Sequence, residues 1–124
     1  MDGLTSATLV HAERTSIHPS AVVAPGAELG RGVRIGPFCM VGANAVLEDG
    51  VQLVSHAVVD GHTVIGADSK LYPFTSVGLE PQDLKYRGEP TRCVIGARTH
   101  IRENVTIHRG TATGRGITRV GDDC

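Results

Sequence analysis

The sequence predicts an all-β, single-stranded solenoid: a parallel β-helix with three short strands in each coil. Three observations predict it. Aliphatic residues recur every six positions, small residues recur four positions after them, and Gly and Pro gather between the two columns. Three six-residue segments make a coil of 18 residues, and successive coils stack at the strand spacing of roughly 4.8 Å.

The aliphatic column is the strongest of these signals. From Ile17 to Val77, every sixth residue is Ile, Leu or Val, although these types make up only 30 of the 124 residues. Eleven matches in one frame have a chance probability on the order of 10⁻⁷. The frame returns at Ile95, Ile101 and Ile107 and is shifted by one residue at Val120. Because six is a multiple of the strand period of two, the column faces inward throughout, and we expect residues one coil apart to stack.

The second column holds small or β-branched residues, which we expect to point inward beside the aliphatic ones. Its members are Ala21, Ala27, Val33, Cys39, Ala45, Val51, Ala57, Thr63, Ser69 and Thr75. Gly is frequent one place after the aliphatic residue and Pro two places after it, as at Gly36 and Pro37, which indicates a tight corner. A period of six does not keep one face on an α-helix, and a β-sandwich needs turns every 8–12 residues.

Composition and charge exclude several classes of protein. The 124 residues suffice for one domain, and with no Trp, two Phe and two Tyr they suit a thin core of branched aliphatic side chains. A net charge of −1 indicates no nucleic-acid partner. No apolar run is long enough for a secretory signal or for membrane insertion. Three cysteines without a CxxC motif indicate reduced thiols in a cytoplasmic protein.

The repeat is interrupted twice. Continuing the column past Val77 would bury Asp83 and Glu89, which is costly for unpaired carboxylates, so we expect residues 79–92 to leave the solenoid as a loop. A second, Gly-rich excursion covers 110–119. Residues 1–14 show no repeat and are expected to form an N-terminal tail, which leaves 15–124 as the β-helix domain.

The first loop and the coil after it carry a family resemblance. The segment QDLKYRGEPT, residues 82–91, followed by IRENVTIHRGT, residues 101–111, resembles the acyl-carrier-protein-dependent UDP-N-acetylglucosamine O-acyltransferases, a family of hexapeptide-repeat acyltransferases. The resemblance extends from Ile17 onward. It implies a left-handed β-helix, a hand that the spacing does not reveal. It also implies that the chain is an N-terminal fragment, truncated at the C-terminus, because less than half of a family member is present.

The resemblance further implies an activity, the first step of lipid A biosynthesis. A 3-hydroxyacyl chain passes from acyl carrier protein to the 3-hydroxyl of UDP-N-acetylglucosamine, and a histidine acts as general base. That histidine is expected beyond Cys124, so we assign no catalytic residue and expect the fragment itself to be inactive. The implied substrate-binding residues are Gln82, Asp83, Lys85 and His108. No cofactor is implied, and the complete protein is expected to be a homotrimer.

Two alternatives stay open beside this assignment. Without the surrounding motifs, an outward strand histidine such as His108 and a polar pair such as Asp83 and Lys85 would be ordinary solvated side chains. The chain could then be a non-catalytic solenoid segment that only binds nucleotide sugar or assembles. His56, His62 and His100 could in principle hold zinc between subunits, as in the γ-class carbonic anhydrases, which are also hexapeptide solenoids, but we assign no metal site.

Overall fold

The computed structural model describes residues 14–79, 92–108 and 116–124, and these form three parallel sheets. Sheet A contains β1 (Ser16–Ile17), β4 (Arg34–Ile35), β7 (Gln52–Leu53), β10 (Lys70–Leu71) and β13 (His100–Ile101). Sheet B contains β2 (Val22–Val23), β5 (Met40–Val41), β8 (Val58–Val59), β11 (Ser76–Leu79) and β14 (Thr106–His108). Sheet C contains β3 (Glu28–Leu29), β6 (Val46–Leu47), β9 (His62–Ile65), β12 (Arg92–Ile95) and β15 (Ile117–Val120).

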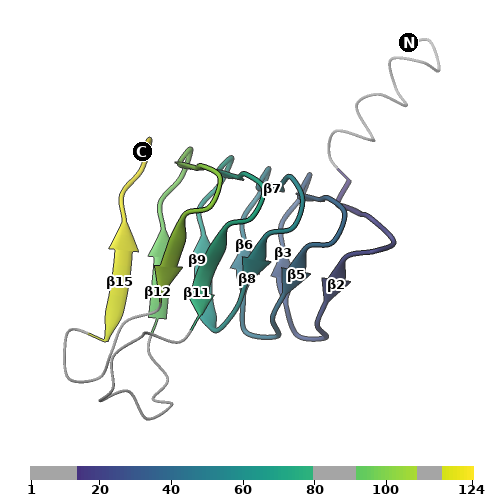
Figure 1. The fold of residues 1–124 in the computed structure, drawn as a ribbon, viewed down its shortest axis with the longest axis horizontal. Coiled ribbons are helices and arrows are strands. Elements are labelled where there is room, and N and C mark those ends of the chain that lie inside the picture. The colour runs from purple at the N-terminus through teal and green to yellow at the C-terminus, as the bar shows by residue number, and fades with distance from the viewer. Residues whose placement is uncertain (1–13, 80–91, 109–115) are drawn as a thin grey trace.

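The chain visits the sheets in the order A, B, C and then begins the next coil, which is the predicted left-handed β-helix of hexapeptide repeats. Figure 1 shows the coils side by side along the long axis, with the strands of sheet B in front of those of sheet C. Every pairing between neighbouring coils is parallel. The fold class expected from the six-residue period is therefore confirmed.

The register between coils is also the predicted one. Ile17 pairs with Ile35, Ile35 with Leu53, and Leu53 with Leu71, and each partner lies one regular coil further along the chain. The next pair in this column joins Leu71 to Ile101, an interval that also contains the first excursion. Ile95 pairs with Val120, and this interval exceeds a regular coil by one hexapeptide and one extra position, which accounts for the shift of the frame.

The strands fix the edges of both predicted excursions. β11 ends at Leu79 and β12 begins at Arg92, so both bounds of the predicted loop 79–92 are strand residues. In the second excursion, predicted for 110–119, residues 117–119 belong to β15, because their pairing with β12 continues the sheet. The remaining residues of these loops and nearly all of the predicted tail lie outside the described part of the chain.

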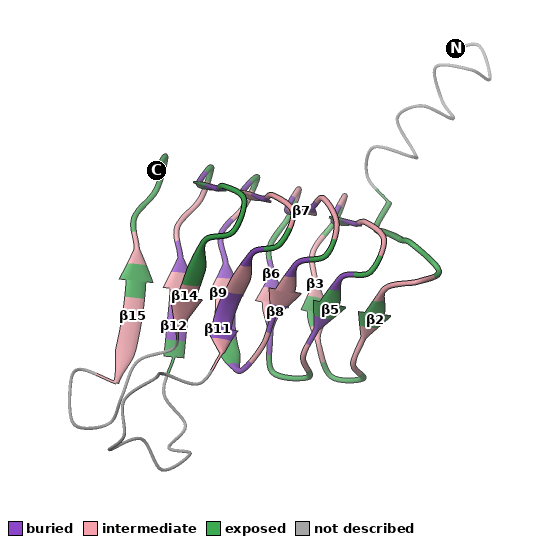
Figure 2. Ribbon diagram, viewed as in Figure 1, coloured by how far each residue is buried: buried purple, intermediate pink, exposed green. Residues whose placement is uncertain are grey.

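The core is a narrow column of branched aliphatic side chains. Leu47, Leu53, Ile65, Leu71 and Ile95 are fully buried, and the small residues between them, including Ala45 and Ala57, are equally inaccessible. Figure 2 shows the buried positions following the strands through the middle coils, whereas exposed positions follow the corners and both ends of the described solenoid. Each coil thus buries its inner side chains against the coils on either side.

Inward hydroxyl side chains are buried in the same column, and each has a hydrogen-bond partner. Thr63 Oγ1 donates to the Asp60 carbonyl at 2.6 Å, and Thr75 Oγ1 donates to that of Tyr72 at 3.0 Å. Ser69 Oγ donates to Gly96 O at 2.8 Å and accepts from Thr99 N at 3.0 Å. Burial of these hydroxyls is therefore tolerated, because each donates a hydrogen bond to a backbone carbonyl.

Candidate functional site

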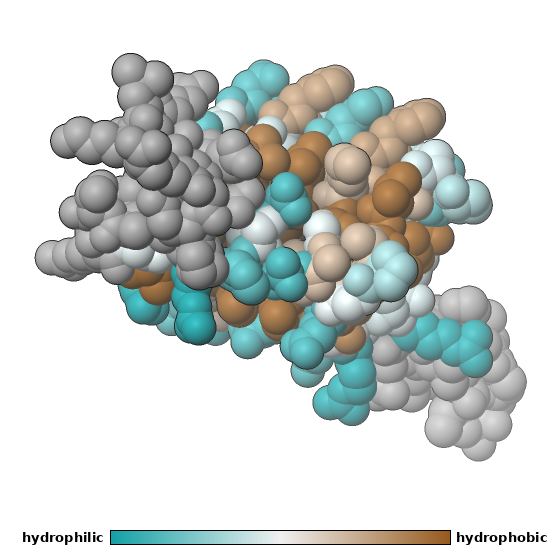
Figure 3. All heavy atoms as spheres, turned by 90° about the horizontal axis from the view of Figure 1, so that it is seen from below, coloured by the Kyte–Doolittle hydropathy of each residue, from teal (hydrophilic) through white to brown (hydrophobic). Residues whose placement is uncertain are grey.

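A groove of about 190 Å³ lies on the outer face of sheet B. Its floor and walls are mainly apolar and come from strands β2, β5, β8 and β11. The lining residues are Val22, Ala24, Met40, Val41, Gly42, Val58, Val59, Asp60 and Leu79. In the view from below, apolar side chains gather in the described surface between the grey regions (Figure 3).

A β-bulge places the end of β11 in this groove. Gly78 has φ of +83°, and the register between β11 and β14 shifts at this residue, so Leu79 rather than Gly78 pairs with His108. A side chain at position 78 would collide with Thr63 Oγ1 and the Asp60 carbonyl. Only glycine fits there, and the bulge brings Leu79, the last described residue before segment 80–91, beside His108.

His108, the predicted substrate-binding histidine, ends strand β14. It follows Ile107, which packs against the core, and its own side chain is half-buried at the edge of sheet B. His108 therefore reaches the outer face of the sheet, next to the residue that leads into the QDLKYRGEPT segment. An imidazole in this position can donate or accept a hydrogen bond to a ligand on the sheet B face.

Asp60 is a candidate that sequence reasoning did not select. It follows inward Val59 as His108 follows inward Ile107, and its carboxylate lies against Gly42, where an added Cβ would overlap Oδ1. Its backbone N–H donates to the Val77 carbonyl at 3.0 Å, which holds it to the bulged strand. The sequence contains a signal for Asp60. Gly is frequent in the column one place after the aliphatic residues, and position 60 of that column holds a charged residue.

The remaining predicted substrate-binding residues, Gln82, Asp83 and Lys85, lie outside the described part of the chain. The structure locates only the two strand ends that flank their segment, Leu79 and Arg92. Leu79 lines the groove and is paired with His108, so the last described residue before that segment lies at the edge of the candidate site. His108 and Leu79, which are more than one coil apart in sequence, are thus neighbours in the fold.

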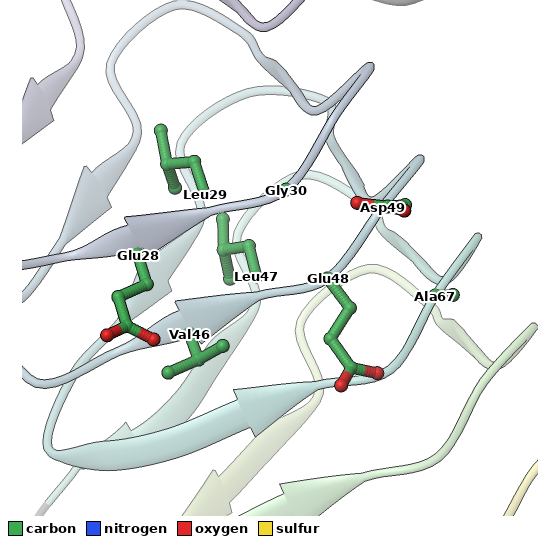
Figure 4. Close-up of a pocket in the computed structure, with 8 residues that line it drawn as sticks. All are labelled: Glu28, Leu29, Gly30, Val46, Leu47, Glu48, Asp49 and Ala67. Atoms are coloured by element: carbon green, nitrogen blue, oxygen red, sulfur yellow. The ribbon is translucent and has the colours of Figure 1, made fainter.

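A second and larger hollow, of about 440 Å³, lies on the outer face of sheet C. Figure 4 shows Glu28 and Glu48 on either side of Val46, with Asp49 in the turn beyond β6. Asp49 Oδ1 accepts a hydrogen bond from the Arg31 backbone N–H at 2.8 Å, so this carboxylate stabilises a corner. Three carboxylates make the hollow unfavourable for an anionic ligand such as a nucleotide.

The histidines considered for zinc are separated by the fold. His56 lies at the corner between sheets A and B, His62 begins β9 in sheet C rather than occupying a corner, and His100 belongs to β13 in sheet A. Within the described residues, no three His, Cys, Asp or Glu side chains are grouped as a metal site requires. The cysteines Cys39, Cys93 and Cys124 are all free thiols, of which only Cys124 is exposed.

Two exposed ion pairs lie away from the groove. Arg98 bridges coils by pairing with Asp123 at 2.7 Å, whereas Arg102 pairs with its sequence neighbour Glu103 at 2.9 Å. The hydrogen bond from Arg98 lowers the pKa of the Asp123 carboxyl, and that from Arg102 lowers the pKa of Glu103. Because all four side chains are exposed, these pairs stabilise the fold only slightly.

Comparisons with known proteins agree with the geometry. The family model for the bacterial transferase hexapeptide (six repeats) matches residues 10–43 and 26–61. The chain is 57% identical over 110 residues to the acyl-[acyl-carrier-protein]–UDP-N-acetylglucosamine O-acyltransferase of Mesorhizobium japonicum, a match that covers 89% of this chain and 39% of the relative. Identity to the enzyme of the same name from Brucella ovis is 46% over 112 residues, which covers 90% of this chain and 40% of that one.

Solved structures give the same result. The UDP-N-acetylglucosamine O-acyltransferase of Moraxella catarrhalis superposes with a TM-score of 0.83 at 45% identity, over 86% of this chain and 41% of the other. The corresponding acyltransferase of Bacteroides fragilis gives a TM-score of 0.82 at 40% identity, with the same coverage. The chain thus spans about 40% of the length of the relatives that it matches.

No helix among the described residues is long and apolar enough to cross a membrane.

Proposed function

We propose that this chain, a homologue of the UDP-N-acetylglucosamine O-acyltransferases, supplies part of the nucleotide-sugar site of such an enzyme. The reaction is transfer of a 3-hydroxyacyl chain from acyl carrier protein to the 3-hydroxyl of UDP-N-acetylglucosamine. It would contribute to lipid A biosynthesis in the cytoplasm, where the free thiols of the chain would stay reduced.

One observation carries this proposal: His108 pairs with Leu79, the last described residue before the QDLKYRGEPT segment, residues 82–91. The strand end that leads toward the first motif and the histidine of the second motif therefore lie at one edge of sheet B, next to a groove. In this proposal, Lys85 pairs with a phosphate of the nucleotide, Asp83 accepts a hydrogen bond from a sugar hydroxyl, and Gln82 and His108 complete the polar contacts.

The chemistry requires groups besides these binding residues. A sugar hydroxyl is a weak nucleophile at pH 7, so a general base with a pKa near neutrality accelerates its attack on the thioester carbonyl, and a backbone N–H stabilises the resulting oxyanion. The family resemblance places that base, a histidine, beyond Cys124. Within these 124 residues we therefore assign binding roles only, with no metal or cofactor, and we expect no acyl transfer by this chain alone.

The same resemblance suggests a homotrimer whose sites lie between subunits, with acyl carrier protein as the donor partner. The trimer is a proposal for the complete protein. An outer face of sheet B that is mainly apolar and groove-shaped supports it, because such a face is suited to contact with a neighbouring subunit.

Two histidines provide a matched test of the nucleotide-sugar site. Isothermal titration of UDP-N-acetylglucosamine into the chain is expected to show binding that His108→Ala weakens at least tenfold. His100→Ala removes an exposed strand histidine from sheet A and should leave the affinity unchanged. Equal loss in the two variants, or no effect of either, would contradict the assignment of His108.

An assay of acyl transfer separates the enzyme proposal from its alternative. The 124-residue chain is expected to produce no acylated sugar from hydroxyacyl carrier protein, and the same chain extended along its reading frame is expected to do so. Detectable, His108-dependent transfer by the unextended chain would refute the placement of the base beyond Cys124. Nucleotide-sugar binding without transfer by the extended chain would favour the non-catalytic solenoid.

A further inference from the structure

The outer face of sheet A is cationic. This sheet forms the side of the solenoid on which β7 is labelled in Figure 1. The residues just before and just after each inward aliphatic position alternate to the outside and form two columns, which we together call the cationic face. The first column contains Arg34, Lys70 and His100, and the second contains His18, Tyr72 and Arg102. Across the described coils, neither column contains Asp or Glu.

The other two sides of the solenoid differ from this face in charge. The hollow on sheet C is lined by Glu28, Glu48 and Asp49, and the groove on sheet B is mainly apolar. The chain as a whole has a net charge of −1, so an excess of Lys and Arg does not explain the cationic face. Its charge results from placing cations on one side of the fold. A surface with one sign of charge attracts a partner of the opposite sign.

Tyr72 holds two of these cations in place. Lys70 Nζ lies 4.9 Å and the central guanidinium carbon of Arg102 lies 4.1 Å from the centroid of the Tyr72 ring, both within the range of a cation–π contact. The ring of His100 lies beside them, with its centroid 6.0 Å from that of Tyr72. Long basic side chains lose rotamer freedom when they bind a partner, and these contacts reduce that cost because they restrict the side chains beforehand.

Acidic side chains leave most of this charge uncompensated. In the part of the chain that the structure describes, Arg34 and Lys70 make no ion pair. Arg102 pairs with Glu103 at 2.9 Å, in an exposed contact that an incoming carboxylate can replace. A hollow of about 330 Å³ lies beside Arg34 on the same face and is lined also by Gln52. The cationic face therefore offers charged hydrogen-bond donors together with space for the groups that they would bind.

The number and the spacing of the cations indicate the kind of partner. Arg34, Lys70 and Arg102 belong to the second, fourth and fifth coils, so they extend over roughly 15 Å, the length of about five residues of an extended chain. Three permanent cations are fewer than the roughly six to ten phosphate contacts of a nucleic-acid surface or the about four to eight clustered basic residues of a membrane-binding one. Arg and Tyr, in contrast, are the residue types that contribute most to protein–protein contacts.

We propose that the cationic face binds an acidic segment of a partner protein. Carboxylates of that segment pair with Arg34, Lys70 and Arg102, and the guanidinium groups can hold a carboxylate through two parallel hydrogen bonds. Tyr72 supplies contact area between these cations. His108 lies on sheet B, on another side of the solenoid, so this inference does not rest on the proposed function.

Fluorescence anisotropy of a labelled oligoglutamate peptide tests the proposal. The wild-type chain is expected to bind this peptide at low ionic strength and not to bind an oligoglutamine peptide. The double variant R34E/K70E should bind oligoglutamate at least tenfold more weakly. R92E/R119E makes the same change of charge at two exposed positions of sheet C and serves as the matched control, in which binding should weaken less than threefold.

Tyr72 provides a test that leaves the net charge unchanged. Tyr72→Phe keeps the ring in contact with Lys70 and Arg102 and should bind oligoglutamate like the wild type, whereas Tyr72→Leu removes the ring and should bind at least threefold more weakly. Circular dichroism establishes whether Y72L is folded. If it is not, R34E/K70E still tests the proposal, because that variant keeps the half-buried tyrosine.

Several results would overturn the proposal. They are equal losses in the two double variants, undiminished binding by R34E/K70E or by a folded Y72L, and no binding of oligoglutamate by the wild type. Phosphatidylserine vesicles or a single-stranded DNA oligonucleotide bound at least tenfold more tightly than oligoglutamate would also overturn it, because the face would then recognise lipid or nucleic-acid phosphates.

Titration of UDP-N-acetylglucosamine into R34E/K70E separates this inference from the proposed function. Unchanged binding of the nucleotide sugar is expected, because His108 lies on another sheet. Weakened binding would show that the cationic face holds the nucleotide phosphates and would overturn the proposal of a protein partner. The effect of His108→Ala on this titration tests only the proposed function.

Discussion

At the scale of single residues, Gly78 has the largest consequence for the candidate site. Its positive φ permits the bulge that pairs Leu79 with His108, and its missing side chain leaves room for Thr63 and the backbone of Asp60. Thr63 in turn donates to the Asp60 carbonyl, so the bulge and the groove share one hydrogen-bonded support. A change at this glycine is therefore expected to disturb the core and the site together.

Replacing Gly78 with Ala is expected to lower the free energy of unfolding by about 3 kcal/mol or more, because the new Cβ collides with buried atoms and the residue must keep a positive φ. Gly121→Ala is the matched control, since the nearest atom to its added Cβ is Cys124 Sγ at 4.0 Å. Urea denaturation measures both. A G78A chain as stable as G121A would show that the bulge does not have the described geometry.

Cys93 gives a pH-dependent prediction. Burial raises the pKa of its thiol to about 11, from an unfolded value near 9. Between these two values the folded chain retains a proton that the unfolded chain has lost, so stability should be complete below pH 9 and fall by about 2–3 kcal/mol as pH rises toward 11. Denaturation of wild-type and Cys93→Ala chains between pH 8 and 11 measures this contribution. If the stability of C93A fell equally steeply over this pH range, the pH dependence would arise from groups other than the Cys93 thiol.

At the scale of the elements, alternate sides of the short strands have opposite roles. In β9, Ile65 is fully buried while Val64 beside it lies on the outer face of sheet C. Ile65 pairs with Leu47 and Ile95 in the neighbouring coils. The inward residues thus pack each strand against its partners in the two neighbouring coils. The outward residues are not needed for this packing, so their types can vary with the function of each face.

Ile65→Asp is accordingly expected to abolish cooperative folding, because it places an unpaired carboxylate at a fully buried position in the aliphatic core. Val64→Asp places the same group one residue away on the outer face and should cost about 1 kcal/mol or less. Circular dichroism during thermal unfolding distinguishes the two outcomes. If I65D melted like V64D, the assigned register would be wrong.

At the scale of the whole molecule, stability is transmitted from coil to coil. Burial is complete in the middle coils, where Leu53 is 1% exposed, and incomplete at the first coil, where Ile17 is 45% exposed. Because each coil contacts only its neighbours, the described solenoid resembles a one-dimensional array with a stable centre.

Amide hydrogen exchange should therefore show a gradient along the chain. We expect the slowest exchange at the amides of Val54 and Val58, which donate to the Leu71 and Thr75 carbonyls of the next coil, both at 2.9 Å. Ser16 and His18, in the first coil, should exchange at least tenfold faster although they make equivalent bonds. If all these amides exchanged at the same rate, the solenoid would unfold as one cooperative unit, and stability would not vary from coil to coil.

The sequence by itself determined the architecture, because a parallel β-helix is a periodic structure and period six is readable in the order of residues. The inward column from Ile17 to Val77, its return at Ile95, and the shifted frame at Val120 all appear in the observed register. Both insertions were recognised because they would have placed charges or a frame shift in that column.

Only the tertiary structure decided which residues meet across the coils. The bulge at Gly78, which joins Leu79 to His108, depends on the absence of a side chain that would collide with Thr63 and the Asp60 carbonyl in the preceding turn. The stack of the Phe38, His56 and Phe74 rings likewise appears only when equivalent residues of successive coils lie next to one another, each with a positive φ. Periodicity specifies which side of a strand faces inward, whereas a site depends on contacts between coils, and these are set by packing and by local departures from the repeat.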